Sequence, residues 1–210
     1  QNDESVYALV NYIHRLNHIF MTGQYRLGVT QLQDLEKSLE THLYGWDVNR
    51  TIVFYYKIAC AYFGADNYSK AVDYLNKIIN MPVADVRNDI QCFARILNLI
   101  AHYELGNKLL ISYQVKSVFR FLSKMEEMQS VQREIFTFLR KTPSMIPDKL
   151  KTEFKVLRSK LVKYQDDPYE KRAFLYLDII AWLDSKIKGI PIETVIQNNI
   201  KNASLTKTGI

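Results

Sequence analysis

The sequence contains few residues that interrupt helices and few that cross-link a chain. Its 210 residues include only 7 glycines, 5 prolines and 2 cysteines. Scarce glycine and proline leave long stretches rich in leucine, isoleucine, lysine, glutamate and tyrosine, which favour helices over a turn-rich sheet protein. Both cysteines, Cys60 and Cys92, stand in apolar stretches, where an unpaired cysteine behaves as a small hydrophobe. The composition therefore predicts an all-α protein without a disulfide framework or a zinc site.

The sequence also lacks motifs that indicate a membrane span or a catalytic site. No apolar run approaches the roughly 18 residues of a membrane span. No glycine-rich phosphate loop, His-Glu-x-x-His helix or nucleophile elbow occurs. His14 and His18 lie four residues apart, as two metal ligands on a helix would, but no third ligand accompanies them. We therefore expect a cytoplasmic, non-enzymatic chain without cofactor or metal. Because it starts at Gln1 rather than at a methionine, we expect a fragment of a longer protein or a processed chain.

The most informative segment runs from Tyr55 to Ile79, where two helical patterns flank the turn Asp66-Asn67. Aspartate and asparagine tolerate unusual backbone angles and cap the helix that follows. Ala59 and Ala71 are small where two antiparallel helices would approach closely. The inward positions are Ile52, Tyr55, Ile58, Ala59 and Tyr62 on the first helix, and Ala71, Leu75 and Ile78 on the second.

Two further units flank this one, and their turns recur about every 40 to 43 residues. Upstream, the segment 12–20 is followed by a turn at Gly23, with Gly28 in the place of Ala71. Downstream, helices over about 86–105 and 109–128 meet at Gly106. The domain prediction is three helical hairpins over 1–128, additional helices closing the stack over 129–197, and a disordered tail over 198–210. The additional helices are expected at about 131–141, 148–164 and 169–188.

Residues 52–80 resemble a tetratricopeptide repeat, and residues 4–40 and 86–128 resemble degenerate copies of it. The whole chain, including Phe174 to Trp182, is similar to the C-terminal parts of uncharacterised repeat proteins of the Bacteroidetes type. The repeat family implies antiparallel hairpins stacked as a right-handed superhelix, whose inner wall binds a peptide or a partner helix. By position, this resemblance assigns the groove wall to Val53, Tyr56, Cys60 and Phe63. So apolar a wall suggests an apolar ligand segment or burial against a part of the same protein that lies outside this sequence.

A polar stripe follows the first helix of the third unit. Arg95, Asn98 and His102 recur with Asn88 and Gln91 at intervals of three and four residues. Burying Arg95 without a partner would cost several kcal/mol, on the order of the penalty for an isolated buried charge. We therefore expect this stripe on an open face and count Arg95, Asn98 and His102 among the groove candidates.

Positive charge gathers in the second half of the chain. Residues 108–163 carry 13 lysines and arginines against 5 aspartates and glutamates. Helical spacing predicts a basic patch made of Lys116, Arg120, Lys124, Lys151, Lys155 and Arg158. Such a patch attracts nucleic acid, an acidic protein or an anionic membrane, or is simply a solvated face.

Two functions follow from these patterns, and neither names a partner. The first is a non-catalytic helical-repeat scaffold for a protein or peptide partner. The alternative is a ligand-sensing or nucleic-acid-binding regulatory region that uses residues 108–163. An accessory region of an enzyme is a third reading, and the oligomeric state stays open.

Overall fold

The computed structural model describes residues 3–81, 87–124, 130–145, 147–170 and 178–208, with only the backbone at Pro143, Pro147, Asp148 and 204–208. Every regular element in these ranges is helical and none is a strand, which confirms the all-α class. The elements are α1 (Asp3–Thr22), α2 (Tyr25–Val29), α3 (Gln33–Glu40), α4 (Val48–Gly64), α5 (Tyr68–Ile79), α6 (Asn88–Glu104), α7 (Lys108–Leu122), α8 (Ser130–Lys141), η1 (Thr142–Ser144), α9 (Pro147–Leu161), η2 (Val162–Tyr164), α10 (Ile179–Lys188) and α11 (Ile192–Thr208).

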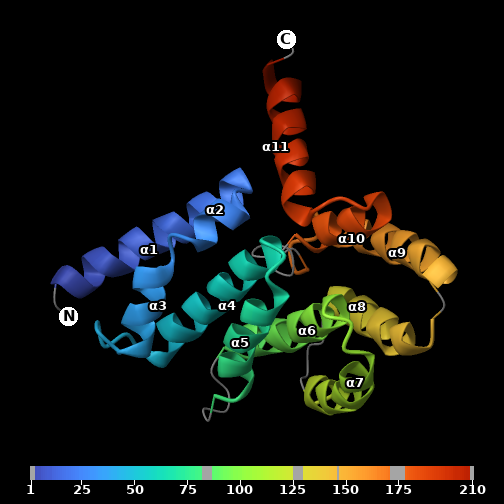
Figure 1. Cartoon of the computed structure of the whole chain (residues 1–210), viewed down its shortest axis with the longest axis horizontal. Helices are drawn as coiled ribbons and strands as arrows, with labels where there is room; N and C mark the ends of the chain where they lie inside the picture. Colours follow the sequence, from blue (N-terminus) through green and yellow to red (C-terminus); the bar gives the residue numbers. More distant parts are fainter. Residues whose placement is uncertain (1–2, 82–86, 125–129, 146, 171–177, 209–210) are drawn as a thin grey trace.

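The helices follow one another along an arc from α1 to α9, after which α10 turns back and α11 leads to the C-terminus (Figure 1). Within the arc, α4 packs most extensively against α5, and α5 against α6. Neighbours in sequence are therefore neighbours in space, as in helical-repeat architectures.

The three predicted turns share one backbone geometry. Gly23, Asp66 and Gly106 each have a positive φ, of 64°, 60° and 74°. Each is followed by one residue and then by the first residue of a helix. Asp66 is the one non-glycine among the three, and Asn67 behind it caps α5 by accepting a hydrogen bond from the backbone N–H of Lys70 at 3.2 Å. The turn spacing of 43 and 40 residues matches the sequence prediction.

The second and third turns also share their hydrogen bonds. In each, the positive-φ residue donates to the carbonyl three residues earlier, and the next residue donates to the carbonyl five residues before it. These bonds satisfy carbonyl groups that the end of a helix leaves without partners. The pairs are Asp66 to Phe63 and Asn67 to Tyr62 in the second turn, and Gly106 to Tyr103 and Asn107 to His102 in the third.

The first hairpin differs because its second arm is divided into α2 and α3. Between them, the N–H groups of Thr30 and Gln31 donate to carbonyls three residues earlier, at 3.2 and 3.0 Å, which tightens the backbone. Leu32 at this break is fully buried. The division thus lets the arm change direction while Leu32 stays in the core.

Small residues lie where helices approach one another, as predicted. Ala59 and Ala71 have no exposed surface. A Cβ atom on Gly28 would lie 2.4 Å from Cγ1 of Ile19, and one on Gly64 would lie 2.3 Å from Cδ1 of Tyr25. Real Cβ atoms do not make contacts this short, so the absence of a side chain sets how closely these helices pack.

The helices after residue 129 agree with the prediction in part. α8 and α9 lie where helices were expected. The expected helix over 169–188 is described only from Ile179 onward, since residues 171–177 lie outside the described residues, as does the end of the predicted helix at 125–128. Tyr169 and Glu170 form a turn instead. The carboxylate of Glu170 caps α8 by accepting from the N–H groups of Ser130 at 2.7 Å and Val131 at 3.1 Å.

The predicted disordered tail over 198–210 is corrected by α11, which continues through Thr208. Ile192, Val195 and Ile196 near its beginning are buried, so tertiary packing starts the helix. No glycine or proline then occurs before Gly209, and nothing interrupts the helix once begun.

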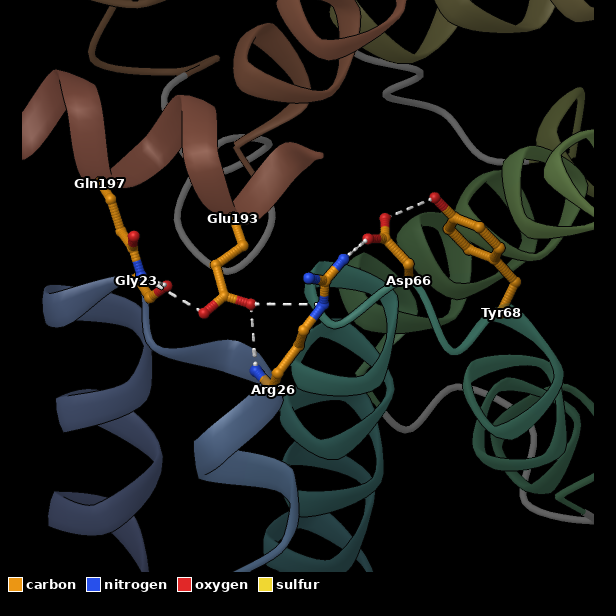
Figure 2. Close-up of polar contacts among 6 residues, drawn as sticks. All are labelled: Gly23, Arg26, Asp66, Tyr68, Glu193 and Gln197. Atoms are coloured by element: carbon orange, nitrogen blue, oxygen red, sulfur yellow. Dashed lines mark hydrogen bonds and ion pairs between the residues drawn. The ribbon is translucent and has the colours of Figure 1, made fainter. Parts of the chain in front are cut away.

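Polar contacts tie α11 to the first turn and, through Arg26, to the second, as Figure 2 shows. Glu193 accepts from the backbone N–H of Arg26 at 3.2 Å, and Gln197 donates to the carbonyl of Gly23 at 3.2 Å. The Arg26 guanidinium donates to Asp66 at 2.7 Å, and Asp66 also accepts from the hydroxyl of Tyr68 at 2.9 Å. The C-terminal helix therefore binds the first turn, and Arg26 at that turn links it to the second.

Glu104, at the end of α6, connects the third hairpin to α10. Its carboxylate accepts from Nε1 of Trp182 at 2.6 Å and from Nζ of Lys186 at 2.5 Å, and only 6% of its side chain is exposed. Trp182 is fully buried and packs edge-on against Phe154 of α9. The C-terminal helices thus bind the hairpin array at its first turn and beside its third.

We expect Gly64→Ala to destabilise the protein by about 1 to 3 kcal/mol, because the added methyl group collides with the ring of Tyr25. Helix propensity alone would favour alanine by about 0.5 to 1 kcal/mol. The collision should therefore reverse the expected sign, as urea unfolding would measure. In a Tyr25→Ala background the same change should be neutral or stabilising. An equal cost in both backgrounds would contradict the packing argument.

We expect Glu104→Ala to cost about 2 to 4 kcal/mol, because it leaves the buried Trp182 indole without its acceptor. Denaturant unfolding followed by tryptophan fluorescence measures this loss. Glu40→Ala is the control, since its pair with Lys77 spans 3.7 Å at an exposed site and should be worth about 0.5 kcal/mol or less. Similar losses in both variants would argue against the bridging role of Glu104.

Candidate functional site

The predicted groove wall lies inside the core. Every residue of α4 from Tyr56 to Gly64 is buried, and Cys60 and Phe63 have no exposed surface. Val53, one turn earlier, is half-buried. A cavity of only about 20 Å³ separates Tyr56 from Ile179 of α10 and Ile135 of α8. The assignment of Tyr56, Cys60 and Phe63 to an open groove is therefore corrected, because helices of the same chain cover them.

The polar stripe on α6 is also covered rather than open. Gln91, Asn98 and His102 are buried, and Arg95 is half-buried. Arg95 donates to the carbonyl of Ile79 at 3.4 Å and stacks its guanidinium 3.5 Å from the ring centroid of Phe121.

The sequence argument against burial assumed that Arg95 would have no partner. The carbonyl and the ring supply partners and offset part of the desolvation cost. Asn98 similarly donates to Asn76 of α5 at 3.2 Å. The stripe therefore lies at the contacts between α6 and its neighbouring helices. Its side chains Arg95, Asn98 and His102 take part in packing rather than in an open groove.

His102 is held in its neutral form by its surroundings. Burial lowers its pKa below the ordinary 6.5. The amide Nδ2 of Asn107 lies 3.1 Å from Nδ1 of the imidazole. At this distance the amide N–H donates a hydrogen bond to Nδ1 when Nδ1 carries no proton. Protonation of Nδ1 would break this contact.

The low pKa of His102 predicts a loss of stability in acid. The unfolded chain binds a proton at His102 below about pH 6.5, whereas the folded chain binds it only at a lower pH. The stabilisation is therefore complete above about pH 6.5 and falls below it. His102→Gln should therefore lose less stability than the wild type between about pH 7.5 and pH 5.5. His14→Gln, the same change at an exposed site, is the control. Unfolding measured at both pH values would refute the assignment if the two variants respond alike.

The structure divides the predicted basic patch into separate parts. Lys116 and Arg120 lie on α7 and line one pocket, and Lys124 is exposed just beyond that helix. Arg158 instead pairs with Asp184, at 2.5 Å from Nε and 3.2 Å from Nη2. Lys151 and Lys155 are exposed on α9.

The pocket between α7 and α8 has a volume of about 380 Å³, within the usual range of ligand sites of about 300 to 1,000 Å³. Val115 and Phe136 form its buried apolar floor. Phe119 stacks on Phe136 with ring centroids 5.7 Å apart, and half of Phe119 is exposed. Lys116, Arg120 and Arg140 complete the lining. The pocket combines an aromatic floor with a rim of three cations.

These cations have no carboxylate partner among the described residues. The one hydrogen bond described for them runs from Nε of Arg120 to the backbone carbonyl of Lys116 at 3.4 Å. Arg140 and Phe136, which the sequence prediction missed, are four residues apart and so lie on one helix face. Their spacing was visible, but nothing in the sequence indicated that this face meets α7.

A second pocket, of about 290 Å³, lies between the second turn and the turn from α10 to α11. Its charged groups are already occupied. Asp66 binds Arg26 and Tyr68, and Lys186 binds Glu104. It therefore offers a ligand fewer free groups than the α7–α8 pocket.

The outer face of α7 continues the surface beside the pocket. Leu109 is 81% exposed and Tyr113 is 78% exposed, and they lie four residues apart on the same side of the helix. In Figure 1, α7 lies on the outside of the arc. We call Leu109, Tyr113, Phe119 and the pocket rim together the α7 surface.

The described part of the chain shows neither a metal site nor a helix suited to a membrane. His14 and His18 are both exposed on α1. Over the described ranges, no group of three or more histidines, cysteines, aspartates or glutamates is placed to hold a metal ion. None of the helices described has the length and apolar character needed to cross a bilayer.

No family model matches the chain, and neither a curated protein nor a solved structure matches it. The pocket and the hairpins are therefore interpreted from this chain's own residues.

Proposed function

We propose that this chain is a non-catalytic scaffold of the tetratricopeptide type, with its hairpins stacked as a right-handed superhelix, which binds a segment of a partner protein. The repeated turns at Gly23, Asp66 and Gly106 and the small residues at the helix contacts support the architecture. The buried unpaired thiols of Cys60 and Cys92 suit a reducing compartment, so the proposal places the protein in the cytoplasm.

The observation that carries the binding function is the uncovered α7 surface. Ile111, Val115, Val118 and Leu122 bury one face of α7, yet large apolar side chains also stand on its outer face. Apolar residues exposed together beside a concave site are typical of surfaces that bind a partner. The inner wall, in contrast, is filled by the chain's own helices. The partner therefore docks on α7 rather than in the groove of the family pattern.

The same surface favours a second candidate function, the binding of nucleic acid or another polyanion. Lys116, Arg120 and Arg140 converge on one pocket without carboxylate partners among the described residues. Such binding would weaken steeply with salt, because it releases counterions from phosphates.

We expect peptides selected from a displayed random library against the full chain to depend on α7. The double change Leu109→Ser and Tyr113→Ser should weaken their binding by about tenfold or more, since it removes two exposed apolar contacts. The matched control is Tyr7→Ser with Leu43→Ser, at side chains that are 75% and 64% exposed on α1 and just after α3. Fluorescence anisotropy measures both. A library that yields no binder, or binders equally sensitive to both double variants, would remove the proposal.

A further inference from the structure

The α7–α8 pocket differs from the rest of the α7 surface because it joins charge to an apolar floor. Lys116 and Arg120 stand on α7, and Arg140 stands on α8 across the pocket. On a helix, residues four apart are separated by about 6 Å along the axis. An occupant of the pocket therefore meets positive charge on both walls at once.

We propose that this pocket binds an acidic segment of a partner protein, with one large apolar or aromatic side chain against Phe119 and Phe136 and flanking carboxylates on Lys116, Arg120 and Arg140. The proposal rests on the scaffold function above and names the chemistry of its partner. A pocket of about 380 Å³ accommodates one large side chain with adjoining backbone, not a folded surface.

Charge complementarity selects the acidic partner. Arginine donates through a planar fork that fits a carboxylate with two parallel hydrogen bonds, and two of the three cations are arginines. A basic or neutral segment would instead bury or crowd these cations without neutralising them, which disfavours its binding.

The apolar part of the surface argues for a peptide over a single-stranded nucleic acid. Strand-binding proteins stack successive bases on exposed aromatic faces along a basic track. Here Phe136 is 5% exposed, and one face of Phe119 already lies against it. The neighbouring exposed side chain of Leu109 is aliphatic and binds no phosphate. A peptide with alternating acidic and apolar side chains satisfies both parts of this surface.

The direct test uses a fluorescein-labelled synthetic peptide with a phenylalanine-leucine pair flanked by glutamates. A second peptide replaces every glutamate with glutamine. In anisotropy titrations at about 0.1 M salt, where charges are screened beyond about 10 Å, the acidic peptide should bind the full chain at least tenfold more tightly. Equal binding of the two peptides would overturn the assignment of carboxylates to the pocket.

Variants locate the binding. Arg120→Gln with Arg140→Gln should weaken the acidic peptide by about tenfold or more, and Phe119→Ala should weaken both peptides. Lys151→Gln with Lys155→Gln removes the same charge from exposed positions on α9 and should change affinity by less than about twofold. Circular dichroism checks that each variant is folded. If the α9 variant loses as much affinity for the acidic peptide as the pocket variant, the binding reflects general attraction to a basic protein and the inference is wrong.

The remaining outcomes separate this inference from the scaffold function. If a labelled oligothymidine binds more tightly than the acidic peptide and depends on Arg120 and Arg140, the occupant is nucleic acid and the inference is wrong. If library-selected peptides require Leu109 and Tyr113 but ignore Arg120 and Arg140, the scaffold function stands without it. If no peptide of any kind binds, both are wrong.

Discussion

The enclosure of the second half of α4 is the constraint on which the rest of the structure depends. From Tyr56 to Gly64 this helix has no open face, so each helix around it needs a closely fitted contact. The methyl groups of Ala59 and Ala61 and the bare backbone of Gly64 provide that room. A helix covered on every side cannot also supply the wall of a binding groove. The enclosure therefore moves any partner site away from the centre of the hairpin array.

The C-terminal helices complete this enclosure by packing beside the turns of the hairpins. Glu104 binds Trp182 and Lys186, while Glu193 and Gln197 of α11 bind the backbone at the first turn. A stack of hairpins would otherwise be held only by contacts between neighbours. These longer-range contacts couple its two ends, so the array should unfold more cooperatively than independent repeats.

In the third hairpin, α7 differs from α4 because other helices cover only one of its faces. Its buried face packs on α6 and α8, and its outer face keeps Leu109 and Tyr113 in solvent. Beside them lie cations without a carboxylate partner among the described residues, whereas Arg158 elsewhere in the same basic region is neutralised by Asp184. The net charge of the region does not distinguish the pocket cations from Arg158, but the presence or absence of a carboxylate partner does. The proposed partner site is thus where apolar surface and unpaired charge coincide.

The sequence by itself determined the all-α class, most of the helices before residue 162, the three turns and the small contact residues. Periodicity, the turn residues Gly23, Asp66 and Gly106, and Gly28 in the place of Ala71 act over a few neighbouring positions, so their patterns are legible in the chain. Only the tertiary structure decided which faces are covered. It buried Cys60 and Phe63, gave Arg95 the ring of Phe121, and brought Arg140 and Phe136 to Lys116 and Arg120. Those outcomes depend on contacts between segments far apart in sequence, which local spacing does not encode.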